Sequence, residues 1–390
     1  MMRKRVSRRY TRRPHTTLPL HVSALLVLVA MVSACSFSGP QPATKTFSSS
    51  QVQRFDELVN AAIGIYRVPG VVVSIDDPNV GNFTKAYGTA DAGSGRKLAI
   101  NDHYRINSVT KTFTATGVLQ LVEQGQLSLE DPLEKYVQGV PNGSVITIRE
   151  LLAMRAGVYD YIADKQYQDS YNANPLLQSW KSTDVLAVLQ RHAAEFTTPD
   201  QQSVYSNSNY ILLGLVLEAV TKQPADRLIT DHVIRPLGLS ATTFPTSPAM
   251  PEPYAHGYEV STEMRDVTQS DHGWTDGAMV SNVPDMVRYV KQLATGRLLH
   301  ASMQKERLKL QPFASSEIRL QYGLGILQVG EWLGHSGLGG GYDDHVFYLP
   351  SKGATVVVMV NASMGGYDVG GLDVWLPLVK YLYPASLPSQ

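Results

Sequence analysis

The chain has 390 residues, of which 43% are hydrophobic and 17% are charged, a globular composition that excludes an intrinsically disordered chain. Lys and Arg together number 34, as do Asp and Glu, and this balance gives no sign of a nucleic-acid-binding surface. The length is sufficient for two or three structural units around sizeable cores.

The N-terminal segment has the pattern of an export signal. Its basic residues are concentrated in residues 3–13, and the first 34 residues include no acidic residue. A largely apolar run follows at 18–32, shorter than the roughly 20 residues that a membrane-spanning helix needs. A basic start, a short apolar stretch and small residues before a cleavage site are typical of a signal peptide. We therefore expect residues 1–34 to be removed, which would leave a mildly acidic chain.

The only cysteine of the chain, Cys35, directly follows Val32-Ser33-Ala34. This tetrapeptide resembles the lipobox of bacterial lipoproteins. The resemblance implies that Cys35 carries a lipid and that the protein is anchored to the outer face of the bacterial cell membrane. Ordinary secretion with a spare thiol and an uncleaved signal anchor remain alternatives. A single cysteine excludes an intramolecular disulfide.

The next elements are expected to be a tether, a helix and two strands. Residues 35–50 are rich in Ser, Pro and Thr, as in flexible linkers. Apolar residues recur at three- and four-residue spacing over 52–63, which predicts a helix. Strand-like runs at 71–75 and 83–87 come before a turn at 91–95.

A mainly helical region is predicted for residues 106–274. The sequence Thr147-Ile-Arg-Glu150 has the pattern of a capping box at the start of a short helix, which Gly157 is expected to stop. Further helices are expected at 107–125, 183–191 and 209–222.

Strands are predicted again in the last third of the chain. They are expected at 323–329, 344–349 and 354–361, with a closing helix at 376–383. The run 355–360 is apolar throughout, which predicts a central strand. The order of strands, helices and strands predicts one α/β unit made from residues 51–105 and 275–390.

The first motif with chemical content is Ser108-Val-Thr-Lys111. Residues three apart on a helix share a face, so the lysine amine can reach the serine hydroxyl. A lysine whose pKa is lowered by burial or by nearby cations can act as the base that activates a serine. The same pattern occurs at Ser94 and Ser302, but only Ser108 follows a strand-like run and opens an apolar-periodic helix.

Two further segments have residues suited to the same reaction. In Tyr205-Ser-Asn207 the phenol can shuttle a proton, and the amide can hold both a substrate carbonyl and the lysine. In Gly334-His-Ser-Gly337 the small residues let a substrate lie against the backbone, where an N–H group can stabilise an oxyanion. Taken singly, the first segment is more typical of loop packing, and the second of a glycine-rich hairpin with a surface histidine.

In order and spacing, the three motifs resemble those of the serine β-lactamase and DD-peptidase superfamily. The resemblance extends over residues 52–362 and is greatest to the branch of class C β-lactamases, D-alanyl-D-alanine carboxypeptidases and related esterases. It implies an α/β (α+β) fold with an antiparallel sheet flanked by helices and an inserted all-α domain. The active site would lie in the groove between them.

The resemblance also implies the catalytic roles. Ser108 would be the acylated nucleophile, Lys111 its base and Tyr205 the proton shuttle to the leaving group. His335, in place of a lysine that is frequent in this motif, would help to set the proton of Tyr205. The backbone N–H groups of Ser108 and Leu338 would form the oxyanion hole.

Substrate contacts are expected from the second and third motifs and from two aromatic residues of the cleft. The expected residues are Asn207, His335, Ser336, Gly337, Leu338, Trp274 and Tyr159. The two aromatic residues are slightly more typical of core or rim packing.

One departure from the family bears on the substrate. Carboxypeptidases of this branch hold the peptide carboxylate with an arginine and threonines near the third motif, where this chain has Ile326, Leu327 and Leu338. A carboxylate without a paired cation is poorly stabilised. The sequence therefore favours an ester or a neutral amide, and both esterase and D-Ala-D-Ala carboxypeptidase activity stay open.

The predicted function is that of a serine hydrolase acting on a cell-envelope peptide, ester or β-lactam. The alternative is a non-catalytic envelope binding protein, against which the intact set of nucleophile, base and tyrosine argues. Asp343-Asp-His345 has no partner ligand in view, so we expect neither a metal site nor a cofactor. The expected partners are a small-molecule or peptidoglycan-like substrate and the membrane, and not nucleic acid.

Overall fold

The computed structural model describes residues 45–387, except for 177–178, 271–272, 314–319 and 364–369. The predicted signal peptide, Cys35 and most of the predicted tether lie outside the described residues. Within the described ranges, no helix has both the length and the apolar character needed to cross a membrane.

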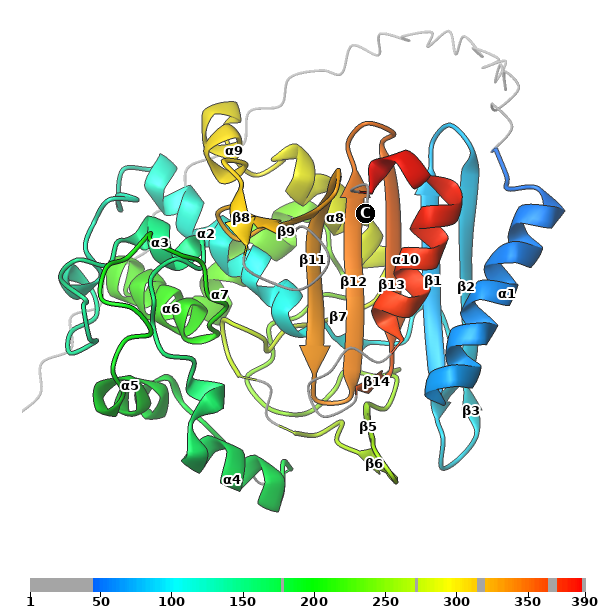
Figure 1. The fold of residues 1–390 in the computed structure, drawn as a ribbon, viewed down its shortest axis with the longest axis horizontal. Helices are drawn as coiled ribbons and strands as arrows, with labels where there is room; N and C mark the ends of the chain where they lie inside the picture. The colour runs from blue at the N-terminus through cyan, green and yellow to red at the C-terminus, as the bar shows by residue number, and fades with distance from the viewer. Residues whose placement is uncertain (1–44, 177–178, 271–272, 314–319, 364–369, 388–390) are drawn as a thin grey trace, which may run out of the picture. The chain divides into compact units, whose positions relative to one another are not determined.

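A nine-stranded antiparallel sheet organises the described part of the chain (Figure 1). Its order is β3 (Arg96–Lys97), β2 (Gly81–Asp91), β1 (Gly70–Asp77), β13 (Ala354–Val360), β12 (Tyr342–Leu349), β11 (Trp332–Gly339), β10 (Leu327–Val329), β9 (Leu320–Tyr322) and β8 (Gln311–Phe313). Strand β1 pairs with both β2 and β13, so segments far apart in sequence share one sheet. Every residue of β13 is buried, which confirms the predicted central strand.

Helices cover both faces of this sheet. Helix α1 (Ser49–Tyr66) and helix α10 (Gly371–Leu382) lie together on one face, where α10 contacts β13 and β12. Helix α8 (Val283–Thr295) packs on the opposite face (Figure 1). Its buried residues recur at three- and four-residue spacing, and its ends are fixed by an Asn282 N-cap and a left-handed Gly296.

A group of helices lies beside the sheet in Figure 1. It consists of α2 (Thr110–Glu123), α3 (Ile148–Leu152), α4 (Lys165–Ala173), α5 (Ser182–Arg191), α6 (Ser208–Thr221) and α7 (Ala225–Ile229). The predicted capping box is confirmed, because Thr147 and Glu150 exchange side-chain and backbone hydrogen bonds at the start of α3. This helix ends at Leu152, five residues before the glycine that was expected to stop it.

The other strands and one further helix belong neither to the nine-stranded sheet nor to this group of helices. They are β4 (Tyr104–Arg105) paired with β7 (Val280–Ser281), a small sheet of β14 (Ala362–Ser363), β5 (Tyr258–Val260) and β6 (Met264–Asp266), and α9 (Ala301–Arg307). Strands β5 and β6 lie within the region predicted to be mainly helical. The predicted domain boundaries stay predictions.

The prediction of one strand over 323–329 is wrong. Strand β9 ends at Tyr322 and β10 begins at Leu327, with a turn between them. Gly325 in this turn has a φ of +71°, and a Cβ there would lie 2.1 Å from the Cβ of Ala115 in α2. The apolar run is therefore interrupted by a glycine that close packing against α2 requires.

Candidate active site

The strand-to-helix junction after β4 holds the predicted nucleophile and its base. Ser108 lies in the single 3₁₀ turn Asn107–Val109, and Lys111 lies in the first turn of α2. The lysine is completely buried, and its Nζ lies 2.9 Å from Ser108 Oγ. The structure therefore brings the two side chains of the first motif within hydrogen-bond distance.

The turn that carries Ser108 is tied to the third motif. Asn107 has a φ of +44°, a left-handed conformation that is uncommon for a residue other than glycine. Its Nδ2 donates to the carbonyl oxygen of Gly339, at the end of β11, at 3.1 Å. A Cβ at Gly337 would lie 2.3 Å from the carbonyl oxygen of Ile106, so only glycine lets β11 approach this turn so closely.

Lys111 has two other oxygen partners. Its Nζ donates to Asn207 Oδ1 at 2.7 Å and to the carbonyl oxygen of Asp276 at 2.8 Å. Both oxygens can only accept, so they occupy two N–H bonds of the lysine. With the contact to Ser108 Oγ, three oxygen atoms surround Nζ and fix its position. The ring of Tyr205 also lies close, with its centroid 5.1 Å from Nζ.

Asp160 stands behind this cluster and was not among the predicted site residues. Its carboxylate accepts hydrogen bonds from the backbone N–H and the Nδ2 of Asn207, both at 3.1 Å. Burial raises the pKa of Asp160 to about 6, against the opposing influence of Lys111 and of the Asn207 hydrogen bonds. A continuous chain of contacts thus runs from Asp160 through Asn207 to Lys111 and Ser108.

His335 of the third motif lies on β11 and is only 3% exposed, so a surface position is wrong for it. Its Nε2 lies 3.0 Å from the Tyr322 hydroxyl, and its Nδ1 lies 2.5 Å from the carbonyl oxygen of Ser336. Burial, together with the charge of Lys111, lowers the pKa of His335 to about 3. Neither of these two hydrogen-bond partners is Tyr205, whose proton this histidine was expected to set.

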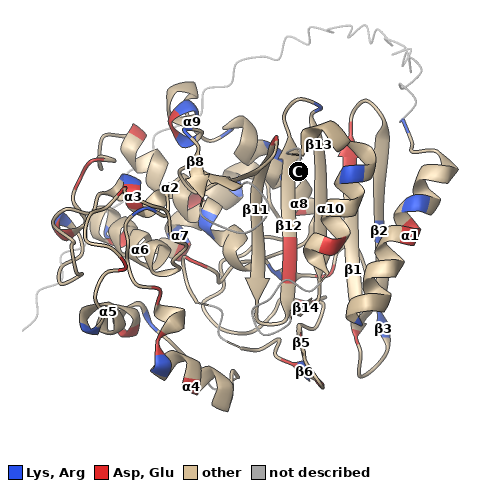
Figure 2. Ribbon diagram, in the orientation of Figure 1, with Lys and Arg blue, Asp and Glu red and all other residues tan. Residues whose placement is uncertain are grey.

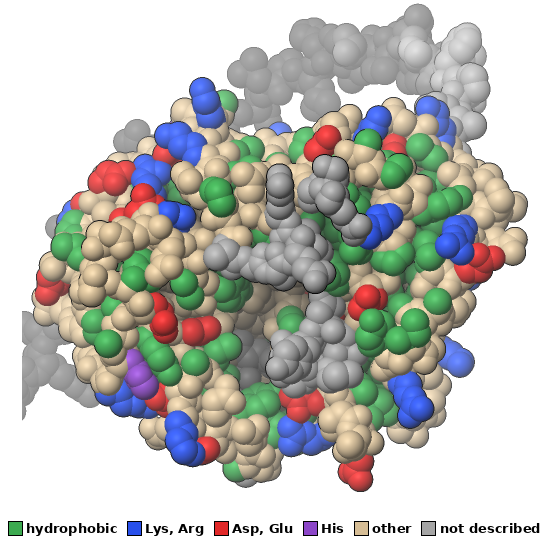
Figure 3. Space-filling model, in the orientation of Figure 1, with side chains coloured by type: hydrophobic (Ala, Val, Ile, Leu, Met, Phe, Trp, Pro, Cys, Tyr) green, Lys and Arg blue, Asp and Glu red, His purple; other side chains and the backbone are tan. Residues whose placement is uncertain are grey.

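Most predicted site residues line one cavity of about 650 Å³. They are Ser108, Tyr205, Asn207, His335, Ser336 and Leu338. In Figure 3 the surface is hollowed between its left and right halves, beside atoms drawn in grey. The three motifs thus meet at one cavity, although up to 230 residues separate them in sequence.

Tyr159 and Trp274 do not line this cavity. The Tyr159 ring stacks on His192, with centroids 3.9 Å apart. Trp274 is partly buried, and its backbone N–H donates to Asp276 Oδ1. Their positions give no support to the predicted substrate contacts, because both side chains pack beside the cavity.

Several residues that line the cavity belong to no sequence motif that would have predicted them as site residues. Helix α4 contributes Tyr167, Gln168, Tyr171 and Asn172, although none of its residues is buried. Glu259 of β5 also lines the cavity, and it accepts hydrogen bonds from the Tyr171 hydroxyl of α4 and from Arg265 of β6. Only the tertiary fold brings these elements together.

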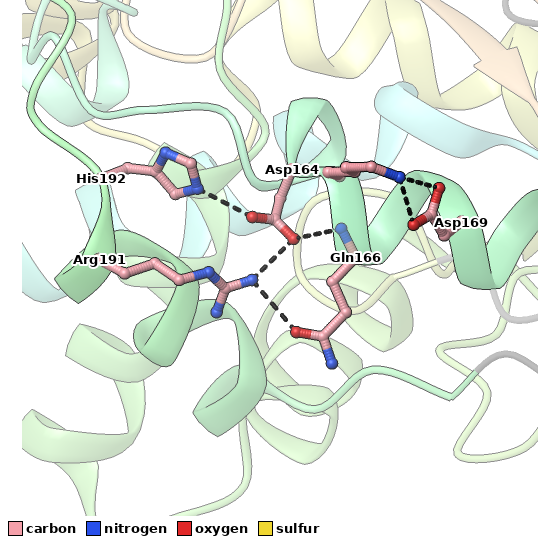
Figure 4. Close-up of a pocket in the computed structure, with 6 residues that line it drawn as sticks. Asp164, Gln166, Asp169, Arg191 and His192 are labelled. Carbon is pink, nitrogen blue, oxygen red and sulfur yellow. Dashed lines mark hydrogen bonds and ion pairs between the residues drawn. The ribbon is translucent and has the colours of Figure 1, made fainter.

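Helix α4 is anchored at its N-terminus by Asp164, which is 3% exposed (Figure 4). The carboxylate caps the helix by accepting from the backbone N–H of Gln166, and it also contacts Arg191 at 2.7 Å and His192 at 2.8 Å. Burial alone would raise the pKa of Asp164, but the contacts with His192 and Arg191 hold it below its usual value. These contacts join one wall of the cavity to the end of α5.

Asp343 and His345 of β12, considered from the sequence as possible metal ligands, make contacts within the fold. Asp343 Oδ2 accepts from the backbone N–H of Gly371, and its Oδ1 lies 3.2 Å from His345 Nε2. Among the residues that the structure describes, no three His, Cys, Asp or Glu side chains form a group that could hold a metal ion.

Comparison with known sequences relates the chain to a single family. The β-lactamase family model matches residues 55–373. The chain is 28% identical over 247 residues to Protein flp of Staphylococcus aureus strain MW2, which covers 61% of this chain and 48% of that protein. It is 29% identical over 240 residues to a protein of Escherichia coli O157:H7 provisionally named a D-alanyl-D-alanine carboxypeptidase, covering 57% of this chain and 54% of that protein. The chain spans about half the length of the curated relatives it matches.

A solved structure extends the similarity to the fold. The D-stereospecific amidohydrolase from Streptomyces sp. superposes with a TM-score of 0.74 at 30% identity, over 85% of this chain and 99% of that one. Together with the family match, this confirms the predicted superfamily and its antiparallel sheet flanked by helices. The chain belongs to the β-lactamase family.

Proposed function

We propose that this protein is a serine hydrolase that forms an acyl-enzyme at Ser108. The observation that carries the proposal is the 2.9 Å contact between Lys111 Nζ and Ser108 Oγ at the wall of a cavity large enough for a small substrate. A buried amine beside an alcohol has no evident use in a protein that only binds a ligand.

The proposed reaction has two steps. Neutral Lys111 takes the proton of Ser108 as Oγ attacks the carbonyl carbon, and backbone N–H groups of Ser108 and Leu338 stabilise the oxyanion. Tyr205 passes a proton to the leaving alcohol or amine as its bond to the carbonyl breaks. The Tyr205 phenolate then takes a proton from the water that attacks the acyl carbon, and Lys111 returns its proton to Ser108 Oγ as the acyl–oxygen bond breaks.

The lining of the cavity favours an ester or a neutral amide over a terminal carboxylate. Leu327 and Leu338 supply apolar surface beside the third motif. Arg265 is the basic residue among the described lining residues, and it is already paired with Glu259. Among the described lining residues, a free carboxylate would therefore find no unpaired Lys or Arg. The amidohydrolase similarity supports an amide, and the Escherichia coli relative supports a cell-envelope peptide.

We also propose that the protein acts at the cell envelope, exported and anchored through a lipid on Cys35. The sequence pattern of residues 1–35 supports this proposal. Labelling cells with a radioactive fatty acid should mark the wild-type protein and leave Cys35→Ala unlabelled. Equal labelling of both would exclude Cys35 as the lipid attachment site.

Turnover of a small substrate panel tests the catalytic proposal. The panel contains a short-chain nitrophenyl ester, D- and L-amino-acid amides, a penicillin and a peptide ending in D-Ala-D-Ala. We expect the ester or an amide to be hydrolysed at least tenfold faster than the peptide, and Ser108→Ala to lose all turnover. A folded wild-type protein that turns over none of them would support the non-catalytic binding protein instead.

A further inference from the structure

His335 makes two hydrogen-bond contacts that fix the position of its proton. Nδ1 lies 2.5 Å from the carbonyl oxygen of Ser336, which can only accept, so the hydrogen is on Nδ1. In the neutral ring Nε2 is then an acceptor. Its neighbour at 3.0 Å is the hydroxyl of Tyr322, which must donate.

The surroundings keep this arrangement in place. His335 is 3% exposed and Tyr322 is 1% exposed, so water has little access to either group. Tyr322 ends β9, which pairs with β10, and β10 pairs with the β11 strand that carries His335. Burial disfavours a charged ring, consistent with the neutral form that the geometry requires.

We propose that Tyr322 is a positioning residue for the active site: its hydroxyl holds His335 as a neutral Nδ1–H tautomer. In this state both ring nitrogens are occupied, so His335 does not give a proton to Tyr205. Its ring is locked against the carbonyl of Ser336 and thereby fixes the strand along which a substrate would lie. The catalytic part of this inference rests on the proposed hydrolase function.

The tautomer can be measured without any substrate. In full-length protein labelled with ¹⁵N-histidine, the His335 signals are assigned by their loss in His335→Gln. We expect Nδ1 to be protonated, Nε2 to show a hydrogen-bonded lone pair, and neither to titrate between pH 5 and 8. In Tyr322→Phe the Nε2 signal should move to the position of a free acceptor or the ring should change tautomer. A protonated Nε2 in the wild type, or an unchanged Nε2 signal in Tyr322→Phe, would overturn the proposal.

Kinetics provide the second readout. Loss of one hydrogen bond near the reacting groups should lower kcat of Tyr322→Phe roughly tenfold with little change in KM. Tyr383→Phe is the matched control, because it removes another buried tyrosine hydroxyl, bonded to Asp77, away from the cavity lining. The control should keep wild-type kcat and the His335 signals. Equal losses of kcat in the two variants would contradict positioning by Tyr322.

The two readouts separate the two proposals. A wild-type protein with the expected His335 signals but no turnover of any ester, amide or peptide would refute the hydrolase and support the hydrogen-bonded pair. Full turnover in Tyr322→Phe would refute the positioning role and leave the hydrolase standing.

Discussion

At the scale of single residues, the site is a chain of hydrogen-bonded groups that ends at one alcohol. Asn207 contacts both Asp160 and Lys111, and Lys111 contacts Ser108. Because a buried polar group without a partner costs about 1–3 kcal/mol, each member depends on the next for its orientation. Removing a carboxylate at one end should therefore change the reactivity of the serine at the other.

The raised pKa of Asp160 predicts a pH dependence with opposite signs for activity and stability. Activity should fall as the pH drops below about 6, because a protonated carboxyl no longer supports Asn207 and Lys111. A carboxyl with a raised folded pKa contributes stability that is present in acid and lost as the pH rises through about 6. Profiles of kcat/KM and of the free energy of unfolding against pH will show both trends.

The matched variant for this prediction is Asp160→Asn. It should lack the stability trend assigned to Asp160 and should have low activity at every pH. An acidic limb that remains at the same midpoint in Asp160→Asn would assign that limb to another group.

The catalytic base can be tested in the same assays. Lys111→Gln removes the amine and keeps a polar side chain, and we expect kcat to fall by at least ~10²-fold, as for loss of a general base. The thermal unfolding midpoint should show that the variant is folded. Activity within tenfold of the wild type would exclude Lys111 as the base.

At the scale of elements, the cavity depends on how a short helix is attached. Helix α4 has no fully buried residue, and its packing against the core is limited to partly buried side chains such as Tyr167. Asp164 supplies the attachment, because it caps the helix and contacts both Arg191 and His192 (Figure 4). Loss of this buried carboxylate should therefore weaken the attachment of α4 to the rest of the fold.

Asp164→Ala should loosen this wall. Loss of an N-cap and of charged hydrogen bonds should destabilise the protein by about 2–4 kcal/mol. KM should rise several-fold with a smaller change in kcat, since α4 lines the cavity and does not touch Ser108. Urea denaturation and steady-state kinetics measure the two effects.

Asp169→Ala is the control on the same helix. Its exposed pair with Lys165 should contribute less than about 1 kcal/mol. An unchanged KM in Asp164→Ala would show that α4 does not define the substrate-binding wall.

Several features could be predicted because the residues that determine each of them lie close together in the sequence. The contact between Ser108 and Lys111 follows from a three-residue spacing at the start of a helix. The capping box at Thr147 and the apolar run of β13 are equally local. Each needs no knowledge of the rest of the chain.

Tertiary contacts were not predictable in this way. Asp160 meets Asn207 across 47 residues, and Tyr171 meets Glu259 across 88. The break between β9 and β10 depends on Gly325 packing against α2, which an apolar run does not reveal. Such contacts are set by the fold and leave no periodic signal in the sequence.

At the scale of the whole molecule, the sheet joins early and late parts of the chain. Strands β1 and β13 pair at its centre, and the covering helices come from both ends of the described chain (Figure 1). In Figure 2, acidic and basic residues are interspersed along the ribbon. The core rather than surface charge should therefore determine the stability of the sheet.

Trp375 of α10 provides a test of this core. It is fully buried, packs against Trp332 and Phe347, and donates from Nε1 to the Val356 carbonyl of β13. Trp375→Ala should cost about 3–5 kcal/mol of unfolding free energy. Lys380→Ala, at an exposed position of the same helix, should change it by less than about 0.5 kcal/mol. Similar losses of unfolding free energy in both variants would contradict the view that buried contacts stabilise the sheet.

The acyl-enzyme at Ser108 is tested most directly by measuring the mass of the protein after reaction. Purified wild-type protein, Ser108→Ala and Lys111→Gln are incubated with a penicillin and with a nitrophenyl ester, and intact masses are recorded over time. With at least one of the two substrates, we expect a transient mass increase equal to the mass of the acyl group. Peptide mapping should place the group on Ser108, and Ser108→Ala should show no increase. A covalent group on any other residue, or hydrolysis that proceeds unchanged in Ser108→Ala, would contradict the proposal that Ser108 is the acylated nucleophile.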